Sequence, residues 1–139
     1  MRAVVMHETG DPDVLRYEEA ERPEPGDGEV LIRVRAASVN AIDWKYRRGF
    51  VDRRLPAVLG NDVSGTVEAS RAEDFAEGDE VFGFAASGGY AELATASAAA
   101  IAKKPAAVSH EQAAAIPLAG LTAWQALFDS AGLERGRRR

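Results

Sequence analysis

The chain has 139 residues, of which 46% are hydrophobic and 28% are charged, and its formal net charge is −5. This composition is typical of one globular domain and not of a disordered chain, and the negative charge argues against nucleic acid or an anionic membrane as the main partner. The chain has no cysteine, which excludes disulfides, thiolate nucleophiles and cysteine-ligated metals. Because the N-terminus does not resemble a signal peptide and no apolar run is long enough to span a membrane, we expect a cytoplasmic protein.

Short runs of β-forming residues, separated by glycine- and proline-containing turns, fill the first hundred residues. The clearest run is 30–38, in which Val30, Ile32 and Val34 alternate with the residues of the opposite face. The segment 55–60 reads as a tight connection, and the alanine-rich stretch 94–102 as strand and loop. Short strands at this spacing predict a barrel or a sandwich. We expect strands at residues 2–7, 14–20, 30–38, 62–69, 79–84 and 90–95.

Helical signals are confined to one short segment and to the last third of the chain. Residues 40–48 lose the alternation and end at Gly49, which predicts a short surface helix. Ser109 and Gln112 have the spacing of a capping box, and Pro117 interrupts the turn that follows. A longer helix is expected at 118–130, ending at Gly132. Its apolar stripe consists of Leu121, Trp124, Leu127 and Phe128.

Three segments together resemble one family. ASVNAIDWKYRRG at 37–49, PAVLGNDVSG at 56–65 and AAAIPLAGLTAWQA at 113–126 are similar, in order and spacing, to segments of the zinc-free, quinone-oxidoreductase-like branch of the medium-chain dehydrogenase/reductase superfamily. The resemblance extends over residues 1 to about 134. It implies a mainly β chain with short helices, folded as a GroES-like, partly open β-barrel.

The resemblance also implies a division of the chain. Residues 1–117 correspond to the GroES-like catalytic or substrate domain, and residues 118–139 to a connector helix and a basic tail that lead toward a Rossmann domain, which this sequence lacks. In relatives, NAD(P)H lies in the cleft between the two halves and delivers hydride to a quinone, an enone or a similar small molecule. The only G-x-G here, at Gly26 and Gly28, precedes a predicted strand, so we do not expect these residues to bind NAD(P)H tightly.

The positions that hold catalytic zinc in the zinc-dependent branch are matched here by other residue types. They carry Asn40, Asn61 and Leu118, and the acidic neighbour is matched by Asp62. Neutral amides are poor zinc ligands and leucine is none, so we predict that no metal is bound. The two histidines, at 7 and 110, lie elsewhere and are interpreted as a strand-end residue and a helix N-terminal residue.

Without a metal, a substrate carbonyl has to be polarised by hydrogen bonds. The resemblance places Asn40 beside the substrate and the nicotinamide, where its amide can donate; the alternative is that it caps the short helix. Lys45 and Tyr46 either supply a proton after hydride delivery or simply pack at the barrel mouth. Asp43 is expected to be structural, holding the loop or pairing with an arginine. Thr122 matches a residue that contacts the nicotinamide, or is only a helix residue.

Three functional alternatives remain open at this point. The first is the substrate-side domain of a zinc-independent NAD(P)H-dependent oxidoreductase, inactive without its nucleotide domain. The second is a stand-alone GroES-like binding or assembly protein, for example a homodimer that covers exposed strand edges. The third is an enzyme that acts on a small molecule in this cleft without a nucleotide domain of its own.

Overall fold

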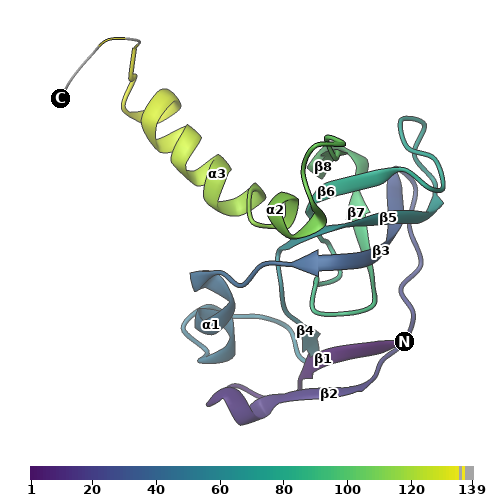
Figure 1. Cartoon of the computed structure of the whole chain (residues 1–139). Coiled ribbons are helices and arrows are strands. Elements are labelled where there is room, and N and C mark those ends of the chain that lie inside the picture. Colours follow the sequence, from purple (N-terminus) through teal and green to yellow (C-terminus); the bar gives the residue numbers. More distant parts are fainter. Residues whose placement is uncertain (135, 137–139) are drawn as a thin grey trace.

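A computed structural model describes residues 1–134 and residue 136. The predicted basic tail therefore lies, apart from Gly136, outside the described residues. In these residues, eight strands and three α-helices follow one another (Figure 1). The strands are β1 (Arg2–Met6), β2 (Leu15–Glu19), β3 (Glu29–Ala37), β4 (Ala57–Val58), β5 (Asp62–Ser70), β6 (Glu80–Phe84), β7 (Leu93–Ser97) and β8 (Ile101–Lys103). The helices are α1 (Ala41–Arg47), α2 (His110–Ala114) and α3 (Pro117–Trp124), with 3-10 turns at Pro12–Val14 and Ala98–Ala100 and π-helical turns at Gln125–Ser130.

Two antiparallel sheets form the body of the molecule. One has the strand order β7-β3-β5-β6-β8 and the other β2-β1-β4. In Figure 1 the larger sheet curls over the smaller one, with α1 beside them and α3 projecting away. The prediction of a mainly β, partly open barrel with short helices is confirmed. Its core consists of Val30, Ile32, Val63, Val67, Val81 and Ala96.

The pairing of β3 with β5 determines where the candidate site lies. These strands run antiparallel, so the end of β3 meets the start of β5, and Ala37 lies opposite Val63. The strands approach closely at Gly65, where an added Cβ would lie 2.1 Å from the carbonyl oxygen of Arg33. A side chain at position 65 would push the two strands apart. This close pairing brings Ser38 and Asn40, just after β3, to Asp62 at the first position of β5.

The segments that differ from the predicted strands are short, and their conformation depends on pairing with a neighbouring strand. The strand expected at 90–95 is found at Leu93–Ser97, because Tyr90 and Ala91 cross toward β1, where Ala91 forms an isolated bridge to Ala3. The two-residue β4, expected as a connection, pairs with β1. The three-residue β8 pairs with β6 and edges the larger sheet.

The helices largely follow the prediction. The capping box at Ser109 and Gln112 is present, and Gly132, with φ +58°, ends the C-terminal helix. Pro117 occupies the first position of α3 instead of only breaking a turn, since a proline at a helix start loses no hydrogen bond. The expected continuous helix at 118–130 changes to π-helical turns after Trp124. No helix in the described part of the chain is long and apolar enough to cross a membrane.

Candidate functional site

A buried aspartate holds the start of α1 against two other segments. Asp43 is 4% exposed and accepts three hydrogen bonds: from the backbone N–H of Asn40 at 2.8 Å, from the backbone N–H of Gly60 at 3.2 Å and from the hydroxyl of Tyr90 at 3.0 Å. No arginine forms an ion pair with it in the part of the chain described. Of the two structural roles expected for Asp43, the structure therefore shows the one that holds the loop.

Tyr90 closes this cluster from the side of β7. Its pKa lies well above the ordinary value of 10.0 because the phenol is buried and because the negative charges of Asp43 and Asp62 oppose its ionisation. Gly60 is required beside it, since Gly60 has φ +92° and an added Cβ would lie 2.6 Å from the ring of Tyr90. Tyr90 is thus a fixed hydrogen-bond donor to Asp43 at neutral pH.

A second polar cluster joins the end of β3 to the start of β5. Asp62 is fully buried, and its Oδ2 accepts from the hydroxyl of Ser38 at 2.7 Å and from the amide Nδ2 of Asn40 at 3.0 Å. The same Nδ2 donates to Ser38 Oγ at 3.0 Å. The other oxygen of Asp62, Oδ1, is buried without a hydrogen-bond partner among the described residues. We call Ser38, Asn40 and Asp62 the Asn40 cluster.

Asn40 also occupies the N-cap position of α1 and forms a capping box with Asp43. The alternative expected for it, a helix cap, is therefore present. Its amide nitrogen is turned toward Asp62 and Ser38. The two acceptors lie 2.7 Å apart on one side of the nitrogen, so one amide hydrogen can serve both and the other is left to donate.

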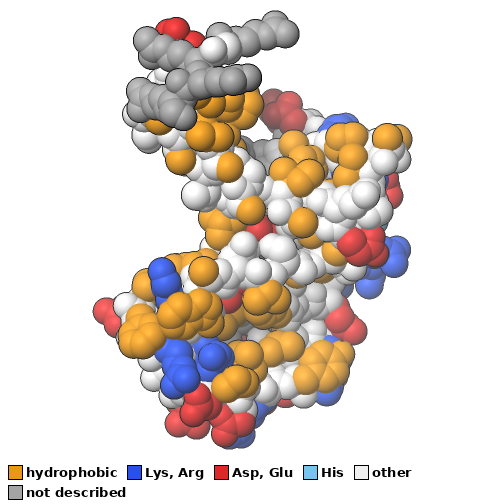
Figure 2. All heavy atoms as spheres, turned by 60° about the vertical axis from the view of Figure 1, so that its left-hand side comes forward, with side chains coloured by type: hydrophobic (Ala, Val, Ile, Leu, Met, Phe, Trp, Pro, Cys, Tyr) orange, Lys and Arg blue, Asp and Glu red, His pale blue; other side chains and the backbone are white. Residues whose placement is uncertain are grey.

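No hydrogen bond joins the other expected site residues to this cluster in the described part of the chain. Lys45 is exposed on α1, and Tyr46 is half-buried, with the guanidinium carbon of Arg53 5.1 Å from its ring centroid. Thr122 is exposed on α3, the helix that projects from the barrel in Figure 1. Figure 2 shows a concave face between this helix and the lobe that carries α1. The neighbouring small cavity, of about 170 Å³, is lined by Leu15, Val39, Asp43, Trp44, Arg47, Leu59 and Tyr90.

A serine, a histidine and a glutamate lie in line on the far side of β5. The hydroxyl of Ser64 is 2.8 Å from Nδ1 of His110, whose Nε2 is 3.2 Å from Glu80. Ser64 is fully buried and donates to the carbonyl oxygen of Val81 at 2.9 Å, so it is not presented to a substrate as a nucleophile. The three residues tie the start of α2 to β5 and β6. Sequence spacing gives no sign of them, because they lie on three separate elements.

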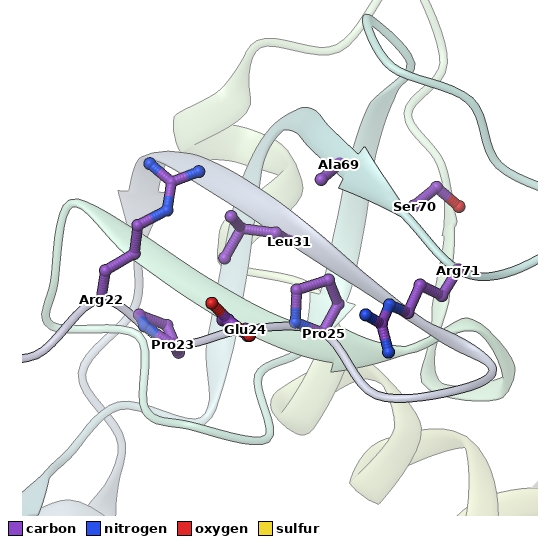
Figure 3. A pocket seen from close by; sticks show the side chains of 8 residues that line it. All are labelled: Arg22, Pro23, Glu24, Pro25, Leu31, Ala69, Ser70 and Arg71. Atoms are coloured by element: carbon purple, nitrogen blue, oxygen red, sulfur yellow. The ribbon is translucent and has the colours of Figure 1, made fainter.

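Two of the larger cavities among the described residues lie away from the Asn40 cluster. One, of about 330 Å³, lies between the Pro23–Pro25 segment and the end of β5 (Figure 3). Its Arg22 is already paired with Glu68 at 2.7 Å. The other, of about 550 Å³, is apolar and is lined mainly by β6, β8 and the start of α3. Neither brings titratable groups together for catalysis.

No group of three or more His, Cys, Asp or Glu side chains in the described residues is arranged to hold a metal ion. At the position of Asn40, the atom turned inward is an amide nitrogen whose lone pair is delocalised and whose hydrogens point at acceptors. The donor set therefore does not fit zinc. Gly26 and Gly28 turn directly into β3 and not into a helix, so this G-x-G does not form a dinucleotide-binding turn.

Comparison with known proteins identifies the family. Residues 26–106 match the alcohol dehydrogenase GroES-like domain. Human quinone oxidoreductase is 40% identical over 98% of this chain, which spans 43% of that protein. A mycobacterial protein solved with NADPH superposes with a TM-score of 0.91 at 44% identity, and the chain covers 43% of it. The quinone oxidoreductase of Escherichia coli, also solved with NADPH, superposes with a TM-score of 0.88 at 32% identity. The match covers 94% of this chain and 41% of the Escherichia coli chain.

The chain thus spans less than half the length of these relatives. The matched residues include both the Asn40 cluster and Asp43, and the fold agrees over almost the whole chain. The chain belongs to the alcohol dehydrogenase GroES-like domain family, and its homologues are quinone oxidoreductases of the medium-chain dehydrogenase/reductase superfamily.

Proposed function

We propose that this chain forms the substrate-side domain of a zinc-independent NAD(P)H-dependent oxidoreductase that acts on a quinone, an enone or a similar conjugated carbonyl compound. The observation that carries the proposal is the Asn40 cluster. It is a preorganised polar group at the junction of β3, α1 and β5, in a chain whose relatives include quinone oxidoreductases solved with NADPH. The reductant would be held mainly outside residues 1–117, which offer no glycine-rich turn leading into a helix.

The division of the chain follows from the same proposal. Residues 1–117 make up the barrel and the site, and residues 118–139 connect to a nucleotide-binding domain. Thr122 is exposed on α3 and Asn40 is half-buried at the start of α1, and Figure 2 shows a concave face between that helix and the lobe that carries α1. Both are proposed to contact the nicotinamide in the assembled enzyme. NAD(P)H supplies hydride when it is bound, and the described residues alone are proposed to be inactive.

The proton needed after hydride transfer is assigned to α1. Lys45 presents an exposed ammonium group and Tyr46 a phenol beside the charge of Arg53, and both groups can donate a proton. A general acid of this kind contributes roughly 10²- to 10⁴-fold to a rate. Asp43 takes no direct part in this step, because its three hydrogen bonds use it as the anchor of α1.

The proton-donor assignment is tested in the complete gene product with NADPH and 1,4-naphthoquinone. We expect Tyr46→Phe or Lys45→Met to lower kcat at least tenfold with little change in KM, because proton donation acts in the transition state. Arg48→Met, which removes an exposed charge at the end of the same helix, serves as the control. If neither Tyr46→Phe nor Lys45→Met lowers kcat more than the control does, the assignment is wrong.

A second candidate function, assembly through the C-terminal helix, is favoured by one observation. The expected apolar stripe faces solvent: Leu121, Trp124, Leu127 and Phe128 are 46%, 59%, 47% and 42% exposed. A contiguous patch of large apolar side chains is normally covered by another protein surface. Sedimentation velocity on the 139-residue chain decides the matter: a mass twice that of the monomer, abolished by Trp124→Lys, supports assembly, and a monomer at all concentrations removes it.

A further inference from the structure

Apart from the C-terminal tail, the densest run of positive charge in the sequence lies beside α1. Residues 45–54, KYRRGFVDRR, include five Lys and Arg residues and one Asp, in a chain whose net charge is −5. They comprise the end of α1 and the loop that follows it, and we call them the basic segment. Figure 2 shows Lys and Arg side chains among hydrophobic ones on the lobe that carries α1, next to the concave face.

Most of these charges have no carboxylate partner in the part of the chain that the structure describes. Arg48 forms an ion pair with Asp11 at 3.0 Å, and it is the one cation of the segment that does so. Two others donate to backbone carbonyl oxygens, and the last two have exposed side chains without a hydrogen bond or ion pair. The first two are Arg47 and Arg53, and the last two are Lys45 and Arg54. The protein therefore leaves most of the positive charge here without a counter-charge of its own.

Contacts within the basic segment hold its loop against the end of α1. The backbone N–H of Phe50 donates to the carbonyl oxygen of Lys45 at 2.9 Å, so the chain folds back directly after the helix. The guanidinium carbon of Arg53 lies 5.1 Å from the ring centroid of Tyr46, which keeps this charge beside α1. Like charges gathered on one lobe repel one another, and an anion bound among them would relieve that repulsion.

Two exposed aromatic side chains belong to the same surface. Trp44, which directly precedes the segment, is 45% exposed, and Phe50 is 71% exposed. Their ring centroids are 5.6 Å apart in an edge-to-face arrangement. Such a pair offers apolar area to a planar ring, while arginine side chains favour carboxylates and other oxyanions. The combination suits an aromatic anion better than a neutral ring system.

We propose that the basic segment, together with Trp44, binds an acidic group, a carboxylate or a sulfonate, attached to the ring system of an aromatic substrate. That this anion belongs to the substrate rests on the proposed function. Asn40 and Lys45 are five residues apart, or about 8 Å along the axis of α1, a span that a bicyclic compound with an acidic substituent covers. The other source of such an anion is the phosphate groups of NADPH, and the experiment below separates the two.

Tryptophan NMR on the 139-residue chain tests the binding surface. The sequence has two tryptophans, Trp44 and Trp124, and Trp124 lies on α3, where it serves as the internal reference. We expect naphthalene-2-carboxylate to shift the indole signal of Trp44 more strongly than 2-naphthamide, its neutral isostere, does, and the two probes to affect Trp124 equally. Added salt should weaken this binding. Arg54→Met should raise the dissociation constant about two- to fivefold, and Arg71→Met, which removes an exposed arginine after β5, should leave it unchanged.

Equal shifts of Trp44 with the two naphthalene probes overturn the proposal, and so does an Arg54→Met variant that binds the carboxylate as tightly as Arg71→Met does. Inorganic pyrophosphate is the third probe. If it shifts Trp44 as strongly as the carboxylate and competes with it, the surface recognises phosphate, and the assignment to the substrate is wrong.

Kinetics of the complete gene product test the substrate class itself. We expect Arg54→Met to lower kcat/KM for 1,4-naphthoquinone-2-sulfonate about two- to fivefold and to leave kcat/KM for 1,4-naphthoquinone unchanged. Equal effects on the two quinones, or no effect on either, overturn the proposal. The proposed oxidoreductase function would still stand in that case, because it requires only that NADPH is oxidised by a quinone.

Discussion

Replacing Asp43 by asparagine removes the buried charge that anchors α1 and changes almost nothing else in size. The asparagine oxygen can keep the bonds from Asn40 and Tyr90, which share Oδ2, but its NH₂ group then faces the backbone N–H of Gly60, which Oδ1 accepts at 3.2 Å in the wild type. The variant loses one hydrogen bond, leaves two buried donors facing each other and weakens the other two bonds by removing the charge.

The expected cost is about 2 to 4 kcal/mol of the free energy of unfolding, from a charge-assisted bond worth about 1.5 to 3 kcal/mol and an unsatisfied buried donor worth about 1 to 3 kcal/mol, partly offset by relief of the buried charge. At an m-value of about 2 kcal/mol/M, the midpoint of urea unfolding falls by about 1 to 2 M with the slope unchanged.

Asp52→Asn is the matched control, since Asp52 is exposed and follows the same helix. It should change the free energy of unfolding by less than about 0.5 kcal/mol. An Asp43→Asn variant as stable as this control, or more stable than the wild type, would refute the view that Asp43 anchors the site through hydrogen bonds to its charged form.

Three further changes test the surrounding structure. The pKa of Tyr90 is raised in the folded state, so the protonated phenol contributes fully to the free energy of unfolding below pH 10.0, its ordinary pKa, and this contribution is lost as the pH rises toward the higher folded value. In urea titrations at increasingly alkaline pH, the Tyr90→Phe variant should therefore lose less stability than the wild type. Parallel curves of stability against pH for the two proteins would contradict this. Gly65→Ala should destabilise by about 3 kcal/mol or more, because its Cβ would lie 2.1 Å from a backbone oxygen, whereas Gly26→Ala, with 3.5 Å to its nearest neighbour, should cost far less. Ser64→Ala should lower the urea midpoint by freeing His110 and the Val81 carbonyl, an effect of about 1 to 3 kcal/mol, and an unchanged midpoint would remove the tie between α2 and the sheet.

The parts of the fold that sequence reasoning predicts best are those in which local pattern and burial agree. The strand at 30–38 is found at Glu29–Ala37, where Val30 and Ile32 are fully buried as the alternation predicts, although Leu31 between them is buried too. The helix after Asn40 and the capping box at Ser109 are also local features and appear as expected. The two- and three-residue strands β4 and β8 exist only because a partner strand lies beside them, and such pairing has no local signature.

In the candidate site, too, sequence reasoning predicts the local features and misses those that depend on distant residues. The resemblance identifies Asn40 and suggests a holding role for Asp43, and both residues lie at the start of α1. The orientation of the Asn40 amide could not be foreseen, since it depends on Asp62, which lies 22 positions away and acts only through the β3–β5 register. The tie between Ser64 and His110, 46 positions apart, was missed for the same reason.

The most direct test of this account is NADPH oxidation with 1,4-naphthoquinone by the complete gene product, before and after exhaustive removal of metal, in the wild type and in Asn40→Ala. The account predicts that activity survives metal removal and falls at least tenfold in the variant, because hydrogen bonding from the Asn40 cluster, and no bound zinc, orients the substrate. Activity that is lost with the metal and restored by zinc, or an Asn40→Ala variant as active as the wild type, would contradict it.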